Sequence, residues 1–385
     1  MPPPQTSDTD DFGPNFGLLA RQKIETMIRR GMIVAQKPID DGQAQPASLD
    51  LRLGPLAYRV RASFLPGRER PVMEQLAAFA RDEDAINLEH GAVLERGCVY
   101  VIPLLERLRL PDSILGVANP KSSTGRLDIF TRLITDRSET FDRVARGYDG
   151  ALYAEVSPRS FPARVRTGSK LNQIRFRRLN SQQLHLSDFT VEDRDLAQRH
   201  ALLPLVDDAL NLRQGLILRV ALKPENGAQR EAPIGFRAQK HADIVDVDRV
   251  GGYRLADYWE PIAPRDDGRL ILDPGEFYIL ASRERLHIPR DLAAEMVPID
   301  PAMGEFRVHY AGFFDPGFGA APDGRPGARA VLEVRSHEVP FVLEDGQIIG
   351  RLVYEKMAEA PLTLYGEGSN YQGQGLKLSK HFTMG

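Results

Sequence analysis

The sequence repeats itself once. Residues 100–115, "YVIPLLERLRLPDSIL", and residues 278–293, "YILASRERLHIPRDLA", share a tyrosine, a Glu-Arg-Leu triplet and a proline in one register, 178 residues apart. The same spacing relates further landmarks, including Glu155 and Glu333. Because chance does not hold one register over so many positions, we predict a duplicated domain whose two copies share one fold.

Each copy has the pattern of a series of short β-strands. The clearest strand segments are "CVYVIPL", "ALYAEVS", "FYILAS", "ARAVLEV" and "IIGRLVY". Turn sequences such as "LPDS" and "LEDGQ" separate them. Helical spacing of apolar residues is confined to residues 20–33 and residues 71–82. The fold class is therefore mainly β, with two tandem distorted-barrel or jelly-roll domains and a few short helices.

The domain boundary is expected in the polar stretch at residues 180–199. We assign residues 18–190 to the first domain and residues 191–385 to the second. Residues 1–17, rich in Pro, Asp and Gly, lack the basic start and apolar run of a signal peptide. They are predicted to form a flexible leader.

Composition limits the classes of partner. A net charge of −3 gives no overall attraction to nucleic acid or anionic lipid, so any anion site must be local. No apolar run approaches the length of a membrane span, and we expect neither nucleic acid nor a membrane as a partner. The single cysteine, Cys98, excludes an internal disulfide and a multi-thiolate zinc site, and favours a cytoplasmic location.

One local candidate for an anion site is "NPKSSTGRLD", residues 119–128, which follows an apolar run. Hydroxyls and backbone N–H groups in a Gly-containing turn can surround phosphoryl oxygens, and Lys121 and Arg126 can neutralise their charge. The Walker A pattern is absent from it. On composition alone, a solvated Ser/Gly turn remains the alternative.

Four further elements, in order along the chain, complete a family pattern. They are "SLDLRLG" (48–54), "DPGFG" (315–319), "VLE" (331–333) and "NYQGQG" (370–375). Together with "PKSSTGRL", they resemble the dCTP deaminase branch of the dUTPase-like family. The resemblance covers nearly the full length and implies two tandem dUTPase-like domains.

Neither half of the chain carries the full set of elements. The first half has "RGYDG" (146–150) where the D-P-G-F element is expected. The second half has "PIDPAMG" (298–304) at the repeat position equivalent to the serine loop, residues 121–126. In the family the site lies between neighbouring copies of the domain. The resemblance therefore implies one composite type of site, with both halves contributing from the same or a neighbouring chain.

The resemblance also implies roles for single residues. Glu333 is expected to transfer protons, while Ser122 and Arg126 orient the attacking water and stabilise developing charge. Glu155 stays open as the alternative catalytic glutamate, although the sequence around Glu333 is the closer match. Without the resemblance, either glutamate is better explained as an outward charge on an edge strand. The nucleotide-binding residues so implied are Lys121, Ser123, Thr124, Gly125, Ala311, Asp315, Val331, Leu332, Tyr371 and Gln374.

The implied activity is hydrolytic deamination of dCTP to dUTP and ammonia. Zinc deaminases use an H-x-E…P-C-x-x-C signature that this chain lacks, so the reaction is expected to proceed without zinc. Mg²⁺ is expected to accompany the triphosphate. The implied assembly is a homo-oligomer, and a trimer is one possible form because single-domain relatives form trimers. Cleavage of dUTP, alone or coupled to deamination, is one alternative, and a non-catalytic nucleotide-binding regulator is another.

A basic cluster between Arg164 and Arg178 also stands out, with Arg175 and Arg177 at alternating positions. We interpret it as a solvated face of a strand pair, with phosphate steering as the alternative.

Overall fold

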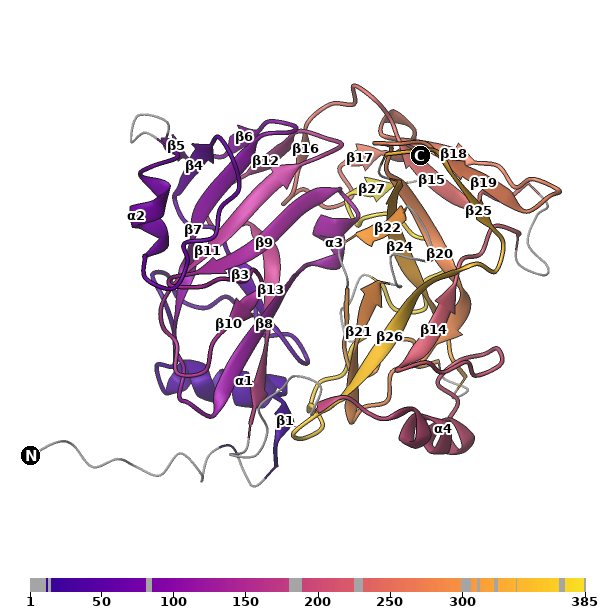
Figure 1. Ribbon diagram of the computed structural model, residues 1–385, viewed down its shortest axis with the longest axis horizontal. Helices are drawn as coiled ribbons and strands as arrows, with labels where there is room; N and C mark the ends of the chain where they lie inside the picture. The colour runs from indigo at the N-terminus through magenta and orange to yellow at the C-terminus, as the bar shows by residue number, and fades with distance from the viewer. Residues whose placement is uncertain are drawn as a thin grey trace, which may run out of the picture.

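The two halves of the sequence form two lobes that lie side by side (Figure 1). The computed structural model describes residue 12 and residues 15–80, 85–179, 189–224, 231–298, 306–309, 312–321, 325–336, 338–366 and 371–383. The indigo and magenta strands build the first lobe, and the orange and yellow strands build the second. In the part of the chain so described, no helix is long and apolar enough to cross a membrane.

The first lobe consists mainly of two antiparallel sheets. Their orders are β1-β13-β8-β10, with β3 beside β13, and β5-β4-β7-β11-β9, with β2 beside β7. The strands are β1 Gly17–Leu18, β2 Ile33–Ala35, β3 Leu49–Arg52, β4 Leu56–Val60, β5 Ala85–Asn87, β6 Ala92–Leu94, β7 Val99–Arg109, β8 Ile114–Pro120, β9 Ile129–Thr135, β10 Arg143–Val144, β11 Asp149–Pro158, β12 Ala163–Val165 and β13 Lys170–Arg178. The helices are α1 Arg21–Arg29, α2 Val72–Leu76 and α3 Ser122–Gly125.

The second lobe repeats this plan, with sheets β14-β26-β21-β23 and β18-β15-β20-β24-β22. Its strands are β14 Leu216–Arg219, β15 Gly235–Ala238, β16 Val245–Asp246, β17 Tyr253–Arg254, β18 Trp259–Ile262, β19 Arg269–Leu272, β20 Tyr278–Leu286, β21 Leu292–Pro298, β22 Phe306–His309, β23 Phe313–Phe314, β24 Ala328–Ser336, β25 Phe341–Glu344, β26 Ile348–Lys356 and β27 Phe382–Thr383. Its helical elements are α4 Asp193–Leu202 and a 3₁₀ turn, Leu255–Asp257.

The structure confirms the mainly β fold and the duplication. Strands β8 and β13 pair with each other, and so do β21 and β26, which begin and end 178 residues later. The same correspondence relates the pair β7–β11 to the pair β20–β24. The internal repeat therefore reflects two copies of one sheet arrangement.

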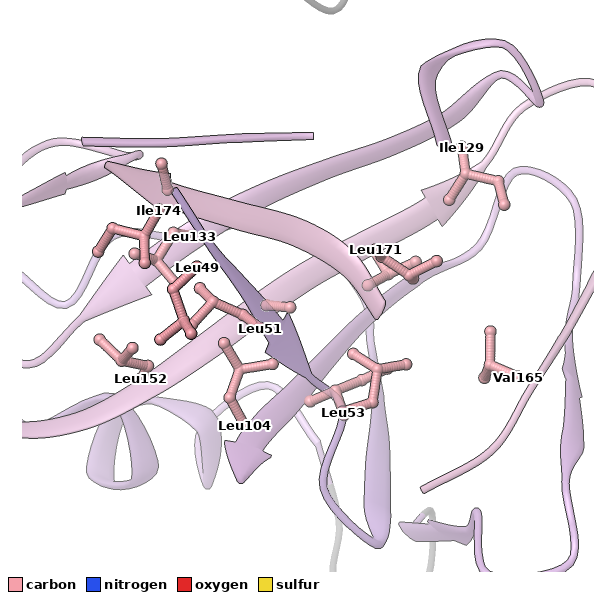
Figure 2. Packing of buried hydrophobic residues seen from close by; sticks show 14 of the residues in the cluster. Leu49, Leu51, Leu53, Leu104, Ile129, Leu133, Leu152, Val165, Leu171 and Ile174 are labelled. Carbon is pink, nitrogen blue, oxygen red and sulfur yellow. The ribbon is translucent and has the colours of Figure 1, made fainter. Parts of the chain in front are cut away.

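Strand β3 shows how the core of the first lobe forms. Leu49, Leu51 and Leu53 alternate with Asp50 and Arg52, and the leucines are fully buried in the core (Figure 2). Burial of each leucine contributes about 1.5–3 kcal/mol of stability. The two charged side chains point to the opposite face, where both are also buried and held by ion pairs.

The repeated Glu-Arg-Leu triplet has a structural reason. Glu106 accepts a hydrogen bond from Arg52 Nε at 2.7 Å, and Glu284 accepts one from Arg219 Nε at 2.6 Å. Each carboxylate also accepts the backbone N–H of its arginine, at 2.8 and 2.9 Å respectively. A buried carboxylate requires such partners, and so both copies kept the glutamate and its arginine.

Both expected helices of the first lobe are present but shorter than predicted. Helix α1 ends at Arg29, because Gly31 takes a left-handed conformation (φ 70°) and Ile33 already begins β2. Helix α2 covers only Val72–Leu76 of the expected residues 71–82.

The interpretation of the basic cluster as a solvated face is wrong for Arg175, Arg177 and Arg178, which are 0%, 1% and 5% exposed. Arg178 lies near the rings of Phe12 and Phe16. The face of β13 that carries Arg175 and Arg177 is covered by the second lobe. Arg177 Nε donates to Glu355 Oε1 at 3.1 Å, and Arg175 Nη2 donates to Asp315 Oδ1 at 2.8 Å. These cations therefore join the lobes.

Replacing Glu355 with Ala is expected to destabilise the protein by about 3 kcal/mol or more, because Arg177 would stay buried without its close carboxylate. Urea denaturation measures this loss. The control is Glu139→Ala, which removes an ion pair with Arg68 whose side chains are 55% and 81% exposed. It should cost at most about 1 kcal/mol. Equal losses in the two variants would contradict the interlobe role of Glu355.

Candidate active site

A cavity of about 260 Å³ lies between the two lobes and is lined by residues of both. The first lobe contributes the serine loop, residues 121–126, which contains α3 at the edge facing the second lobe (Figure 1). The second lobe contributes β24 and the turn after β23. The predicted residues that line the cavity are Lys121, Ser122, Ser123, Arg126, Asp315, Val331, Glu333, Tyr371 and Gln374. A single chain thus brings both sets together.

The serine loop folds as one helical turn between two strands. Lys121 N–H donates to the Leu171 carbonyl at 2.9 Å, and Arg126 N–H closes the turn on the Ser122 carbonyl at 3.1 Å. Asp128 follows in the left-handed region (φ 55°), a conformation that aspartate tolerates better than most residues. This backbone path places the cation at the end of the turn inside the lobe interface.

Arg126 is buried and held on two sides by the C-terminal segment. Its Nη1 donates to the Lys377 carbonyl at 3.0 Å, and its guanidinium carbon lies 4.0 Å from the centre of the Tyr371 ring. Its Nε lies 4.0 Å from Glu333 Oε1, too far for a hydrogen bond, and has no hydrogen-bond partner among the described residues. The guanidinium thus presents an N–H toward the carboxyl group.

Glu333 is 4% exposed and lies on β24, between β20 and β22. Burial raises the pKa of its carboxyl group to about 8, with a further rise from Asp128, although the positive charge of Arg126 opposes the shift. A carboxyl group with this pKa can both give and accept a proton near neutral pH.

The opposite side of the cavity is cationic. Lys121 Nζ forms a close ion pair with Asp50, whose side chain is buried. Lys380 also lines this side, and its pKa is lowered by burial and then by the neighbouring charge of Lys121. Two ammonium groups near a short helical turn suit a chain of phosphates.

Asp315 belongs to the turn after β23 and is fixed by the buried Arg175. The Arg175 guanidinium also donates to the carbonyls of Ala294 and Phe314, both at 3.0 Å. It lies 4.1 Å from the Phe313 ring centre. The aspartate is therefore held rigidly at the cavity wall.

The C-terminal segment crosses from the second lobe to the first. The Arg329 N–H donates to the Gln374 carbonyl at 2.8 Å, and Gln374 Nε2 donates to the Arg329 carbonyl at 3.0 Å. Ser379 Oγ then donates to the Ser123 carbonyl at 2.9 Å. Tyr371 and Gln374 are both buried, so the segment forms part of the cavity wall.

Several predicted residues lie away from the cavity lining. Thr124 and Gly125 are buried within α3, and Leu332 packs in the core of the second lobe. Ala311 lies outside the described residues. Glu155 occupies the position equivalent to Glu333 but is absent from the lining, and it accepts a 2.6 Å hydrogen bond from Arg132.

The sequence reasoning missed two charged residues of the lining, Asp50 and Lys380. Asp50 is the only acid of "SLDLRLG", an element identified by its strand pattern alone. Lys380 follows the "NYQGQG" element in the sequence. No pattern in the residues around it predicts that the chain turns back there to the serine loop. The aromatic residues Phe313, Phe314 and Phe318 also line the cavity and flank the "DPGFG" element.

These features define an enzyme class. A cationic, hydroxyl-bearing loop and a buried carboxyl group whose pKa is raised to about 8 line one cavity, a combination that suits an enzyme that transfers protons. Models of the N-terminal and C-terminal domains of 2'-deoxycytidine 5'-triphosphate deaminase match residues 15–180 and 192–382. The chain belongs to the dCTP deaminase family, and it is a hydrolytic deaminase.

Individual relatives agree with this assignment. The crystal structure of 2'-deoxycytidine 5'-triphosphate deaminase from Agrobacterium tumefaciens is 50% identical, covers 89% of this chain and 99% of its own, and superposes with a TM-score of 0.83. The "dCTP deaminase, dUMP-forming" of Kocuria rhizophila is 30% identical over 158 residues, or 40% of this chain and 75% of its own length. A protein of the same name from Methanoculleus marisnigri is 30% identical over 162 residues, or 42% and 80%.

The raised pKa of Glu333 predicts a pH-dependent stability. Between its ordinary pKa of 4.5 and about 8, the folded state keeps a proton that the unfolded chain loses, so stability should fall as pH rises through this window. Glu333→Gln removes this contribution. Relative to that variant, the free energy of unfolding of the wild type should fall by on the order of 4 kcal/mol across the window. Urea denaturation at several pH values measures the difference, and a pH-independent difference would contradict the raised pKa.

Proposed function

We propose that the chain hydrolyses dCTP to dUTP and ammonia in the interlobe cavity. The observation that carries this proposal is the buried Glu333 carboxyl group, which faces Arg126 from the other lobe at 4.0 Å. Family membership supports deamination and favours an enzyme over a non-catalytic regulator. The identity of the product and the role of each residue are our inference.

The triphosphate binds at the cationic side of the cavity. Lys121 and Lys380 neutralise its charge, and the hydroxyl groups of Ser122 and Ser123 donate to phosphate oxygens. Asp50 keeps Lys121 in place. The described residues hold no cluster of three acidic, histidine or cysteine side chains, so a Mg²⁺ ion that arrives with the nucleotide would be bound mainly by phosphate oxygens and water.

The reaction adds water to C4 of cytosine and removes its amino group. Protonated Glu333 gives its proton to N3, which makes C4 electrophilic, and the resulting carboxylate takes a proton from the attacking water. That proton is then passed to the amino group, and ammonia leaves as the C4 hydroxyl forms the carbonyl and returns its own proton to the Glu333 carboxylate. N3 keeps its proton, so the product is uracil and one water has been consumed.

Arg126 and Ser122 serve the same step. The Arg126 Nε–H, which has no other hydrogen-bond partner among the described residues, can hold the water or the oxygen that forms on C4. The hydroxyl of Ser122 lines the same cavity. Asp315 and its aromatic neighbours would hold the sugar and the base.

We infer that dUTP is the final product, because the other acids that line the cavity are held in ion pairs. Asp50 is paired with Lys121, and Asp315 is paired with Arg175 at 2.8 Å. Of the carboxyl groups that line the cavity among the described residues, Glu333 therefore remains as the proton carrier, and it is used in the deamination. A subsequent hydrolysis of the phosphates would require a second base.

Coupled formation of dUMP is the second candidate. It is favoured by relatives such as the Kocuria and Methanoculleus proteins, both described as dUMP-forming.

The predicted homo-oligomer remains a prediction, although the cavity is already lined by both halves of one chain.

The catalytic role is tested by the same substitution at the two equivalent positions of the repeat. Glu333→Gln should reduce the kcat for ammonia release from dCTP by about 10²–10⁴-fold, because the amide cannot carry the proton. Glu155→Gln is the matched control and should retain kcat within a few-fold, since Glu155 is held by Arg132 away from the cavity lining. A larger loss in the Glu155 variant would reverse the assignment.

The product is tested by incubating the protein with dCTP and following ammonia and pyrophosphate together. We expect ammonia and dUTP in equal amounts and no pyrophosphate, because the described residues that line the cavity offer a single proton carrier. Pyrophosphate released in step with ammonia would instead establish the dUMP-forming reaction.

A further inference from the structure

The turn that carries Asp315 has a counterpart in the first lobe. In the second lobe, Phe314 of β23 pairs with Ala294 of β21. In the first lobe, Val144 of β10 pairs with Gly116 of β8, at the equivalent position of the repeat. Strands β23 and β10 therefore hold the same place in their sheets, and the turns that follow them are equivalent.

The backbone of the two turns confirms the correspondence. The Ile288 N–H donates to the Phe318 carbonyl, and the Leu110 N–H donates to the Tyr148 carbonyl, both at 2.8 Å. The glycine before each aromatic residue is left-handed, with φ of 91° and 68°. Residues Asp315, Pro316, Gly317 and Phe318 thus correspond to Ala145, Arg146, Gly147 and Tyr148.

Side chains have changed the character of the turn in the first lobe. The acid at Asp315 is replaced by Ala145, and the neighbouring proline by Arg146. Arg143 stands where the second lobe has Phe313. One carboxylate has therefore been lost, and a proline and a phenylalanine have each been replaced by a cation, which suits an anion.

This turn borders a cavity of about 320 Å³ within the first lobe. Arg137, Arg143 and Arg146 are exposed side chains of its lining. The hydroxyl residues Ser138 and Thr140 and the apolar residues Leu115, Val117 and Val144 complete it, together with the ring of Tyr148. Asp136 is the one acid of the lining among the residues that the structure describes, and it accepts the Val72 backbone N–H at 2.7 Å.

We propose that this cavity, the arginine pocket, binds a second nucleoside triphosphate without turning it over. The arginines contact the phosphates, and the apolar residues with the Tyr148 ring contact the base. Catalysis does not occur there, because the equivalent glutamate, Glu155, is bound to Arg132 and lies outside the lining. The duplication thus left one catalytic and one binding version of the same turn.

Isothermal titration of the full chain with dUTP tests the proposal. The wild type should bind two dUTP per chain, and the double variant Arg143→Ser/Arg146→Ser should bind one. The matched control, Arg59→Ser/Arg61→Ser, removes two exposed cations from another cavity and should still bind two. One dUTP per chain in the wild type, or an equal loss in the control, would overturn the proposal.

Three further measurements complete the test. Ammonia release from dCTP by the Arg143/Arg146 variant should stay within about twofold of the wild type, which shows that it is folded. If that variant does not fold, Arg137→Ser should weaken the second dUTP by about tenfold, as expected for one charge-assisted contact. Inorganic tripolyphosphate should bind the arginine pocket more weakly than dUTP. Equal affinities would overturn the assignment of a base-binding part.

Discussion

The burial of the Glu333 carboxyl group determines the proton-carrying property of the site. Glu333 is 4% exposed, and Arg126 of the first lobe lies 4.0 Å from its carboxyl group. A lone buried carboxylate would be costly, so the group holds its proton, and the nearby Arg126 moderates the shift without forming a direct hydrogen bond. The chemistry therefore depends on how the lobes pack, and hence on the buried pairs that join them, such as Arg177 with Glu355.

Duplication explains why this arrangement needs only one complete set of residues. Two equivalent sheets were available, and the pairs Arg52–Glu106 and Arg219–Glu284 kept both frameworks intact. With the framework secured in each lobe, the side chains around it were free to diverge. The serine loop was kept in the first lobe, and the aspartate turn in the second.

Much of this could be read from the sequence, because it rests on local patterns. The constant spacing of the repeat predicted two copies of one fold, and the family resemblance carried by short motifs implied that Arg126 and Glu333 share one site. The burial of Arg175 and Arg177 could not be foreseen, since alternation along a strand predicts a common face but not what covers it. Lys380 was not predicted for a related reason: it reaches the cavity through the path of the C-terminal segment back to the serine loop, and a local sequence pattern does not predict that path.

The C-terminal segment also affects how the assembly of the cavity depends on protein concentration. Serine loop and glutamate belong to one polypeptide, and the segment through Ser379 ties the two lobes directly. A tethered partner acts at an effective concentration in the millimolar range, however few molecules are present. Because the described residues that line the cavity belong to a single chain, bringing the serine loop and the glutamate together is an intramolecular step.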